Sequence, residues 1–273
     1  MWLIALVIPF LLFAPSIARA QSACESAKSL CGLEKKANSG DPDAQYLLGL
    51  EFEKGEQVSR DCAEAFRWYE KSAHRGNPQA QNNLGVLYAT GCGVEQNDAL
   101  AFRWYLRSAV AGFAMAQNNV GYMYANGKGT AKSDEAAVHW YSQAARKNFA
   151  PAFANLALHY STGRGAQQDE TEAFRLEKLS AEQSYPPAEY TLGKMYLLGR
   201  GIAADLNAAH HWLQRAARHG VTEAQITLGE LYELGKGVPP NRDQAIHWYK
   251  TAVQSGSEVA RTNLARLQQR PTE

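Results

Sequence analysis

The sequence predicts an all-α fold, an α/α superhelical solenoid of about six helix-turn-helix repeats, each 36 residues long. The tetrapeptide FRWY occurs at residues 66–69 and again at 102–105, and steps of 36 residues bring similar residues into the same columns. Within each period, apolar positions three and four residues apart are separated by glycine-rich turns. This pattern is typical of stacked pairs of amphipathic helices.

The first helix of each repeat is predicted from a narrow apolar face. Ala44, Leu48 and Phe52 stand at i, i+4 and i+8, and later repeats have tyrosine where Phe52 stands. Small residues beside the leucine allow a neighbouring helix to approach closely. That small-residue column reads Gly49, Gly85, Gly121, Ala157, Gly193, Gly229 and Ala265.

A G-x-G turn follows the first helix at 91–93, 127–129, 163–165, 199–201 and 235–237. Glycine tolerates the positive φ that ends a helix. A phosphate-binding role is the alternative, but no GK[ST] or GxGxxG context surrounds these turns. Turn geometry therefore explains them.

The second helix is predicted from a column of favoured N-cap residues and a tryptophan column. The N-cap column reads Asp61, Asn97, Ser133, Asp169, Asp205 and Asn241. The tryptophan column reads Trp68, Trp104, Trp140, Leu176, Trp212 and Trp248. The repeats are expected to end at glycine, or at Asn148 and Ser184 in the third and fourth copies.

Repetition follows from packing, because one helical hairpin cannot bury its own apolar stripe and a stack of copies can. We expect a capping segment at 21–40, six repeats over 41–256, and a capping helix with a tail at 257–273. The fourth repeat departs from the pattern, with Ala157 for glycine, Leu176 for tryptophan and Glu177 for tyrosine. Either drift in a tolerant repeat or a local bend would account for this.

Residues 1–20 are predicted to be a signal peptide, cleaved after Ala20, because an apolar run ends in Ala18-Arg19-Ala20. A membrane anchor is the alternative, although Pro9 and Pro15 interrupt the run. A lipoprotein signal is a lesser alternative. The formal net charge of +1 gives no support for nucleic-acid binding.

The pattern A-x-x-x-L-G-x-x-Y, G-x-G, A-x-x-W-Y-x-x-A-A-x-x-G resembles the Sel1-like repeat, a relative of the tetratricopeptide repeat. The resemblance covers the whole mature chain and implies a superhelical scaffold for other proteins. Bacterial members of this kind often act in the envelope. The Helicobacter cysteine-rich branch has been associated with penicillin binding and β-lactamase activity, but it has a cysteine pair in most repeats, whereas this chain has four cysteines in all.

The cysteines, with predicted export, indicate disulfides. In an antiparallel stack, the end of one repeat's first helix lies beside the start of the preceding repeat's second helix, which predicts a Cys62–Cys92 bond. Cys24 and Cys31 would then pair by elimination. Seven residues along a helix span about 10.5 Å, too far for a disulfide, so that pair requires a bend. No C-x₂-C motif indicates zinc.

A cationic column precedes the tryptophan column. It is interpreted either as a surface for an acidic partner or anionic ligand, or as a solvated helix edge that shields the tryptophans. Its members are Arg67, Arg103, His139, Arg175, His211 and His247.

Two columns of the first helix, opposite its apolar face, vary freely between repeats. In a stack of this kind they are expected to line a concave groove, where asparagine and tyrosine suit an extended peptide. The predicted contact residues are Tyr46, Asn82, Asn118, Tyr122, Tyr190 and Lys194. A neighbouring column with Asn83, Asn119 and Asn155 is interpreted as structural.

The sequence therefore predicts a periplasmic or secreted scaffold that binds a protein or peptide of the cell envelope. It predicts no catalytic residue, cofactor or metal, no nucleic-acid partner, and no membrane insertion after signal cleavage, because the motifs of hydrolases and metalloenzymes are missing. The alternatives are a binder or weak hydrolase of cell-wall ligands such as penicillin, and a component of a larger envelope machine.

Overall fold

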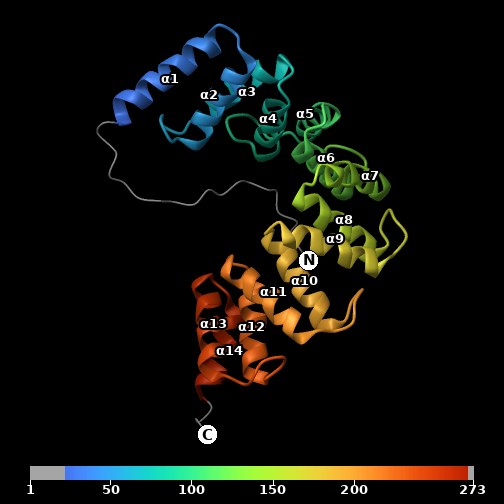
Figure 1. Ribbon diagram of the computed structural model, residues 1–273. Coiled ribbons are helices and arrows are strands. Elements are labelled where there is room, and N and C mark those ends of the chain that lie inside the picture. Colours follow the sequence, from blue (N-terminus) through green and yellow to red (C-terminus); the bar gives the residue numbers. More distant parts are fainter. Residues whose placement is uncertain (1–21, 270–273) are drawn as a thin grey trace. The chain divides into compact units, whose positions relative to one another are not determined.

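The computed structural model describes residues 22–269, and the side chains of residues 30–269 (Figure 1). The predicted signal peptide at 1–20 lies outside the described residues. Every regular element within the described range is a helix, and the predicted all-α solenoid is therefore confirmed. The helices are α1 (Ser22–Asn38), α2 (Pro42–Lys54), α3 (Cys62–His74), α4 (Pro78–Thr90), α5 (Asp98–Val110), α6 (Ala114–Asn126), α7 (Asp134–Arg146), α8 (Ala150–Thr162), α9 (Glu170–Glu182), α10 (Pro186–Leu198), α11 (Leu206–Arg218), α12 (Thr222–Leu234), α13 (Arg242–Gln254) and α14 (Glu258–Gln269).

The chain divides into two compact units, Met1–Lys147 and Asn148–Glu273. The first contains α1 to α7 and the second α8 to α14. In each unit, a repeat is a helical hairpin such as α2 with α3, and the second helix of one repeat packs on the first helix of the next. Each unit therefore has a core shared by successive hairpins.

All six predicted N-caps of the second helices are confirmed. In each case the side-chain oxygen accepts a hydrogen bond from a backbone N–H of the first helical turn, which has no partner within the helix. The predicted repeat ends are also confirmed, because Asn148 and Ser184 adopt φ of 58° and 59°, as the glycines at the equivalent positions do with φ near 90°.

The G-x-G turn combines a helix end with a close backbone approach. Gly91 caps α4 with φ 75° and donates its N–H to the carbonyl of Leu87. Gly93 lies against the start of α3, where an added Cβ would stand 2.2 Å from the carbonyl oxygen of Cys62. Both glycines therefore adopt the left-handed conformation, because Gly93 has φ 73°, and Gly93 in addition leaves room for the close approach of α3.

Within a repeat, the two helices meet at a glycine and a tyrosine. An added Cβ at Gly85 would lie 2.7 Å from the ring of Tyr105, and an added Cβ at Gly49 would lie equally close to the ring of Tyr69. The tyrosines that follow the tryptophan column are fully buried, whereas Trp68 is only half-buried. The ring that seals the hairpin is thus the tyrosine rather than the tryptophan.

Polar contacts repeat with the same period. A buried glutamine of the first helix donates to a carbonyl in the last turn of the preceding second helix, as Gln81 does to Ala73 at 3.1 Å. A buried serine of the second helix donates to the first residue of its partner helix, as Ser108 does to Pro78 at 2.6 Å. Each bond adds a side-chain donor to a backbone carbonyl and connects two neighbouring helices.

Between repeats, aromatic rings meet edge to face. The Phe66 and Tyr88 centroids lie 5.5 Å apart, and those of Phe102 and Tyr124 lie 5.2 Å apart. In the second unit His210 replaces the phenylalanine and its Nε2 lies 3.0 Å from the Tyr232 hydroxyl. Burial lowers the pKa of His210, with a smaller effect from His211, so the imidazole is neutral at neutral pH.

The glycine–tyrosine contact makes a prediction for stability. Gly85→Ala should lower the free energy of unfolding by about 1–3 kcal/mol, because the new methyl group overpacks the Tyr105 ring. Gly32 in α1 has no atom within 4 Å of an added Cβ, so Gly32→Ala should instead stabilise by up to about 1 kcal/mol through helix propensity. Urea unfolding followed by circular dichroism measures both, and equal effects would contradict the packing explanation.

Candidate functional site

The predicted groove residues differ in how far they reach the surface. Tyr46, Tyr122 and Lys194 are half-buried and offer contact area to a partner. The Tyr46 ring packs at 5.9 Å from Tyr69, and the ammonium of Lys194 lies 5.6 Å over the Tyr190 ring. These three side chains are therefore both supported by their neighbours and open to solvent.

The other three predicted contact residues are buried, which corrects their assignment as groove residues. Asn82, Asn118 and Tyr190 are 1%, 5% and 6% exposed. Asn82 accepts from Asn119 of the next repeat at 3.0 Å, and the Tyr190 hydroxyl is hydrogen-bonded to Thr227 of the next repeat. The Asn82 amide and the Tyr190 hydroxyl connect neighbouring repeats, so variation between copies is not a sign of exposure here.

Two of the buried tyrosines that follow the tryptophan column donate a hydrogen bond to a carboxylate. The Tyr69 hydroxyl donates to Glu53, and the Tyr249 hydroxyl donates to Glu233 at 3.0 Å. Burial raises the pKa of both hydroxyls, and the neighbouring carboxylates raise it further, so both are protonated donors at neutral pH. Glu233 also receives two hydrogen bonds from Arg266 in α14.

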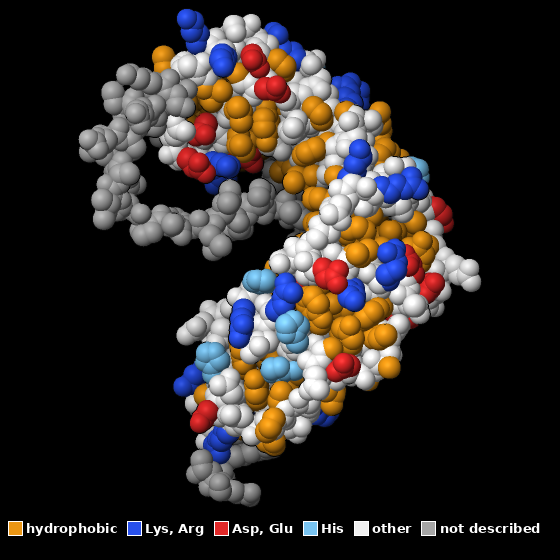
Figure 2. All heavy atoms as spheres, viewed as in Figure 1, with side chains coloured by type: hydrophobic (Ala, Val, Ile, Leu, Met, Phe, Trp, Pro, Cys, Tyr) orange, Lys and Arg blue, Asp and Glu red, His pale blue; other side chains and the backbone are white. Residues whose placement is uncertain are grey.

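The cationic column is exposed in all six repeats. Arg67 and Arg175 form ion pairs with acids one turn earlier in their own helices, at 2.6 and 2.7 Å. His139 lies edge-on to Trp140 at 5.6 Å between centroids. On the face shown in Figure 2, Lys, Arg and His side chains are interspersed with acidic and hydrophobic ones. These contacts favour the solvated-edge interpretation.

A second set of cations, one turn after the tryptophans, was missed by the sequence analysis. Lys71, Arg107 and Arg215 lie over the rings of the tryptophans three residues before them, at 3.9, 4.6 and 4.7 Å from the centroids. The spacing i to i+3 on a helix was the available signal. They cover the outer side of the tryptophan column by cation–π contacts.

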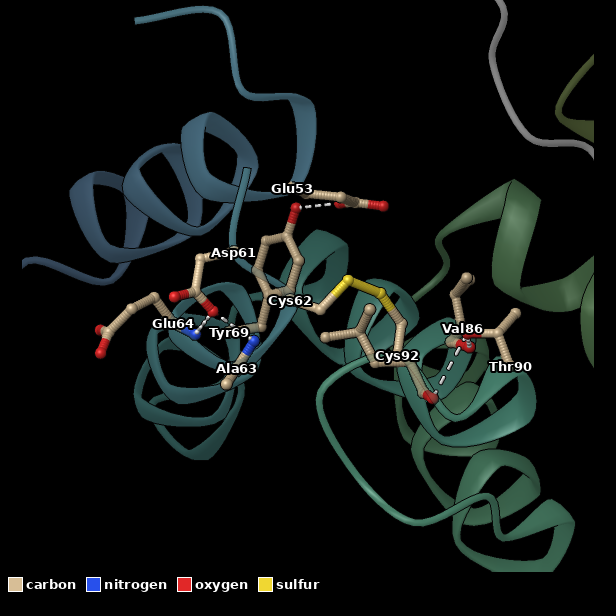
Figure 3. The surroundings of a disulfide bond; sticks show 10 residues. Glu53, Asp61, Cys62, Ala63, Glu64, Tyr69, Val86, Thr90 and Cys92 are labelled. Carbon is tan, nitrogen blue, oxygen red and sulfur yellow. Dashed lines mark hydrogen bonds between the residues drawn. A yellow bond between two sulfur atoms is a disulfide. The ribbon is translucent and has the colours of Figure 1, made fainter. Parts of the chain in front are cut away.

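The predicted Cys62–Cys92 disulfide is present (Figure 3). It joins the start of α3 to the G-x-G turn after α4, with the two Cα atoms 5.4 Å apart. The predicted Cys24–Cys31 pair is wrong: Cys31 is a free, exposed thiol, and α1 runs without a break through both positions. The bend that this pair required is absent from the helix, and the side chain of Cys24 lies outside the described residues.

In the fourth repeat, the exceptions to the pattern lie in the core. Ala157 and Glu177 replace the glycine and the tyrosine that meet in the first, second, third and sixth hairpins, and both are buried. Burial raises the pKa of Glu177 well above its usual range, and one of its carboxyl oxygens lacks a hydrogen-bond partner among the described residues. Alanine in place of glycine on α8 is thus accompanied on α9 by a glutamate, whose side chain is narrower than a tyrosine ring.

The described part of the chain holds neither a metal-binding cluster nor a membrane-spanning helix. No group of three or more His, Cys, Asp or Glu side chains there is arranged to hold a metal ion. None of the helices in this part is long and apolar enough to span a membrane.

Comparison with known proteins identifies the repeat. The family model of the Sel1 repeat matches residues 42–77, 78–113, 114–149, 150–185, 186–221 and 222–257. The chain belongs to the Sel1 repeat family. Sel1 repeat proteins commonly act as protein-interaction scaffolds. No curated protein matches the chain.

Solved structures include two similar Sel1 repeat proteins. A Sel1 repeat protein from Oxalobacter formigenes is 30% identical, with a TM-score of 0.75 over 87% of this chain and 97% of that one. A protective antigen of uropathogenic Escherichia coli is 33% identical, with a TM-score of 0.73 over 88% of this chain. The match spans about half of that antigen, 52%. An immunity protein from Pseudomonas aeruginosa, 21% identical with a TM-score of 0.53 over 78% of this chain and 81% of that one, shares the fold alone.

The Sel1 register predicts a second, engineered disulfide. Asp98 and Lys128 stand one repeat after Cys62 and Cys92, and an added Cβ at Gly129 would lie 2.0 Å from the Asp98 carbonyl oxygen, as at Gly93 and Cys62. The double variant Asp98→Cys, Lys128→Cys should therefore form a disulfide and raise stability by up to about 3 kcal/mol. Thiol alkylation with mass spectrometry checks this. Two alkylated thiols after oxidation would show that the turns pack differently.

The buried carboxyl of Glu177 predicts a pH dependence. Its pKa is raised in the folded state, so the folded protein loses stability as pH rises from about 4.3, the usual value for an unfolded chain, through the folded pKa. Glu177→Gln should remove this loss and stabilise at pH 7 by about 1 kcal/mol or more, with little effect below pH 4. Thermal unfolding across this pH range, with Glu182→Gln on the exposed side of α9 as control, measures the difference.

Proposed function

We propose that this Sel1 repeat protein is a non-catalytic scaffold that binds a segment of another protein along its first helices. The observation that supports the proposal is that the variable columns of these helices carry half-buried aromatic or basic side chains in each unit, Tyr46 and Tyr122 in the first and Lys194 in the second. Rigid tyrosine rings supply contact area at a low cost in conformational entropy. A polar, partly exposed surface of this kind suits a peptide rather than a buried small molecule.

A periplasmic or secreted location forms part of the proposal. The apolar N-terminal run with Ala18 and Ala20 suggests export, and the Cys62–Cys92 bond suits an oxidising compartment. We propose a partner in the cell envelope on these grounds. The alternative function, binding or weak hydrolysis of a cell-wall ligand, stays a prediction. No arrangement of the described side chains supports it.

The test is partner capture by variants of the first-helix face. Tyr46→Ala with Tyr122→Ala should weaken binding at least tenfold, because both remove ring area at the proposed contact. Arg103→Ala on the outer side of α5 is the matched control and should bind normally. Cross-linking in envelope extract identifies the partner, and calorimetry with that purified partner measures affinity. Unchanged affinity in a variant with a normal melting temperature would refute the assignment of this face.

A further inference from the structure

A small depression lies between α4, α5 and α6 of the first unit. It has room at its core for a group about the size of a water molecule. Its lining includes Ala89, Asp98, Tyr105, Asn119, Tyr122 and Lys128. Tyr122 is also one of the residues of the proposed partner-binding face, so the depression opens beside that face.

The depression lies at the repeat position where two other repeats have a glutamate side chain. In the first and sixth repeats, the buried tyrosine hydroxyl donates to Glu53 or Glu233 sixteen residues earlier. In the second repeat that position is Ala89, and the Tyr105 hydroxyl is buried without a hydrogen-bond partner in the described residues. Ala89 is half-buried and lines the depression together with Tyr105.

The hydroxyl of Tyr105 is a donor in need of an acceptor. Burial raises the pKa of Tyr105, and Asp98 raises it further, so the hydroxyl keeps its proton at neutral pH. An unpaired buried donor costs about 1–3 kcal/mol. An acceptor oxygen from a ligand would recover this free energy without moving the ring, which Gly85 and the surrounding helices hold in place.

The charges at the mouth of the depression offset each other and leave a cation within reach of an anionic acceptor. The ammonium of Lys128 is exposed and lies 5.7 Å from the centroid of the Tyr122 ring. Asp98 opposes an incoming anion, but Lys128 offsets its charge in the same depression. The local balance is therefore close to neutral before a ligand carboxylate binds, and the tyrosine hydroxyl adds an oriented donor.

We propose that this depression binds the carboxylate of a glutamate or aspartate side chain in the partner segment, at the place that Glu53 and Glu233 occupy in their own repeats. The inference rests on the proposed function and adds the chemistry of the partner: an acidic residue positioned beside the ring of Tyr122. A carboxylate fits because the equivalent carboxylates already pair with this tyrosine column twice within the chain.

The direct test uses N-acetyl-glutamate methylamide as probe and the matching glutamine derivative as control, titrated into the full chain and followed by NMR. The glutamate probe should shift resonances of Tyr105, Tyr122 and Lys128, with at least tenfold weaker binding of the glutamine probe. Ala89→Glu places a carboxylate in the depression and Tyr105→Phe removes the donor, so each should abolish the shifts. Ala125→Glu, the same change one repeat later, should leave them unchanged.

Several outcomes would overturn the inference. They are no shifts at these residues, equal binding of the glutamine probe, or shifts that persist in both Ala89→Glu and Tyr105→Phe at a normal melting temperature. Partner capture separates this failure from that of the proposed function. If Ala89→Glu binds the identified partner normally while Tyr46→Ala with Tyr122→Ala does not, the scaffold function stands and the carboxylate site falls.

Discussion

The contact between a glycine on one helix and a buried tyrosine ring on the next determines the geometry of the hairpin. At Gly85 the Tyr105 ring occupies the space of a missing side chain, leaving an added Cβ only 2.7 Å from it. A residue with a Cβ would push the helices apart, and the polar bonds between them would lengthen. The serine bond between the two helices of the hairpin depends on this close approach.

The fourth repeat shows that the glycine and the tyrosine of a hairpin constrain each other, because both are replaced there. Ala157 has the Cβ that the other repeats lack, and the facing residue is Glu177 instead of tyrosine. A linear side chain fits beside the extra methyl group, at the cost of a buried carboxyl with a raised pKa. In the fifth repeat Gly193 faces Leu213, a smaller hydrophobic partner, and the hairpin still closes. Both departures keep the helices close, so neither requires a bend in the hairpin.

The period, the helices and the caps were predictable because each follows from local chemistry that the sequence repeats six times. N-caps such as Asp61 and the Cys62–Cys92 bond follow directly from the register. The groove was less predictable because side-chain variation has two sources. Asn82 is buried against its partner Asn119 in the next repeat, whereas Tyr46 in the same column is partly exposed, and a single sequence does not distinguish these cases. The orphaned hydroxyl of Tyr105 required the geometry of the hairpin, since it depends on a residue sixteen positions earlier.

The repeats share a core but differ in whether the buried tyrosine hydroxyl has a carboxylate partner in its own repeat. A tyrosine ring fills the space over glycine in four of the six hairpins, and its hydroxyl can be satisfied from within the repeat or from outside it. Glu53 and Glu233 satisfy it from within, in the first and last repeats. Ala89 does not, although Tyr105 is as deeply buried as Tyr69. The same ring that holds the hairpin together therefore leaves a hydroxyl without a hydrogen-bond partner among the described residues, and the proposed carboxylate site would link the packing of the core to recognition at the surface.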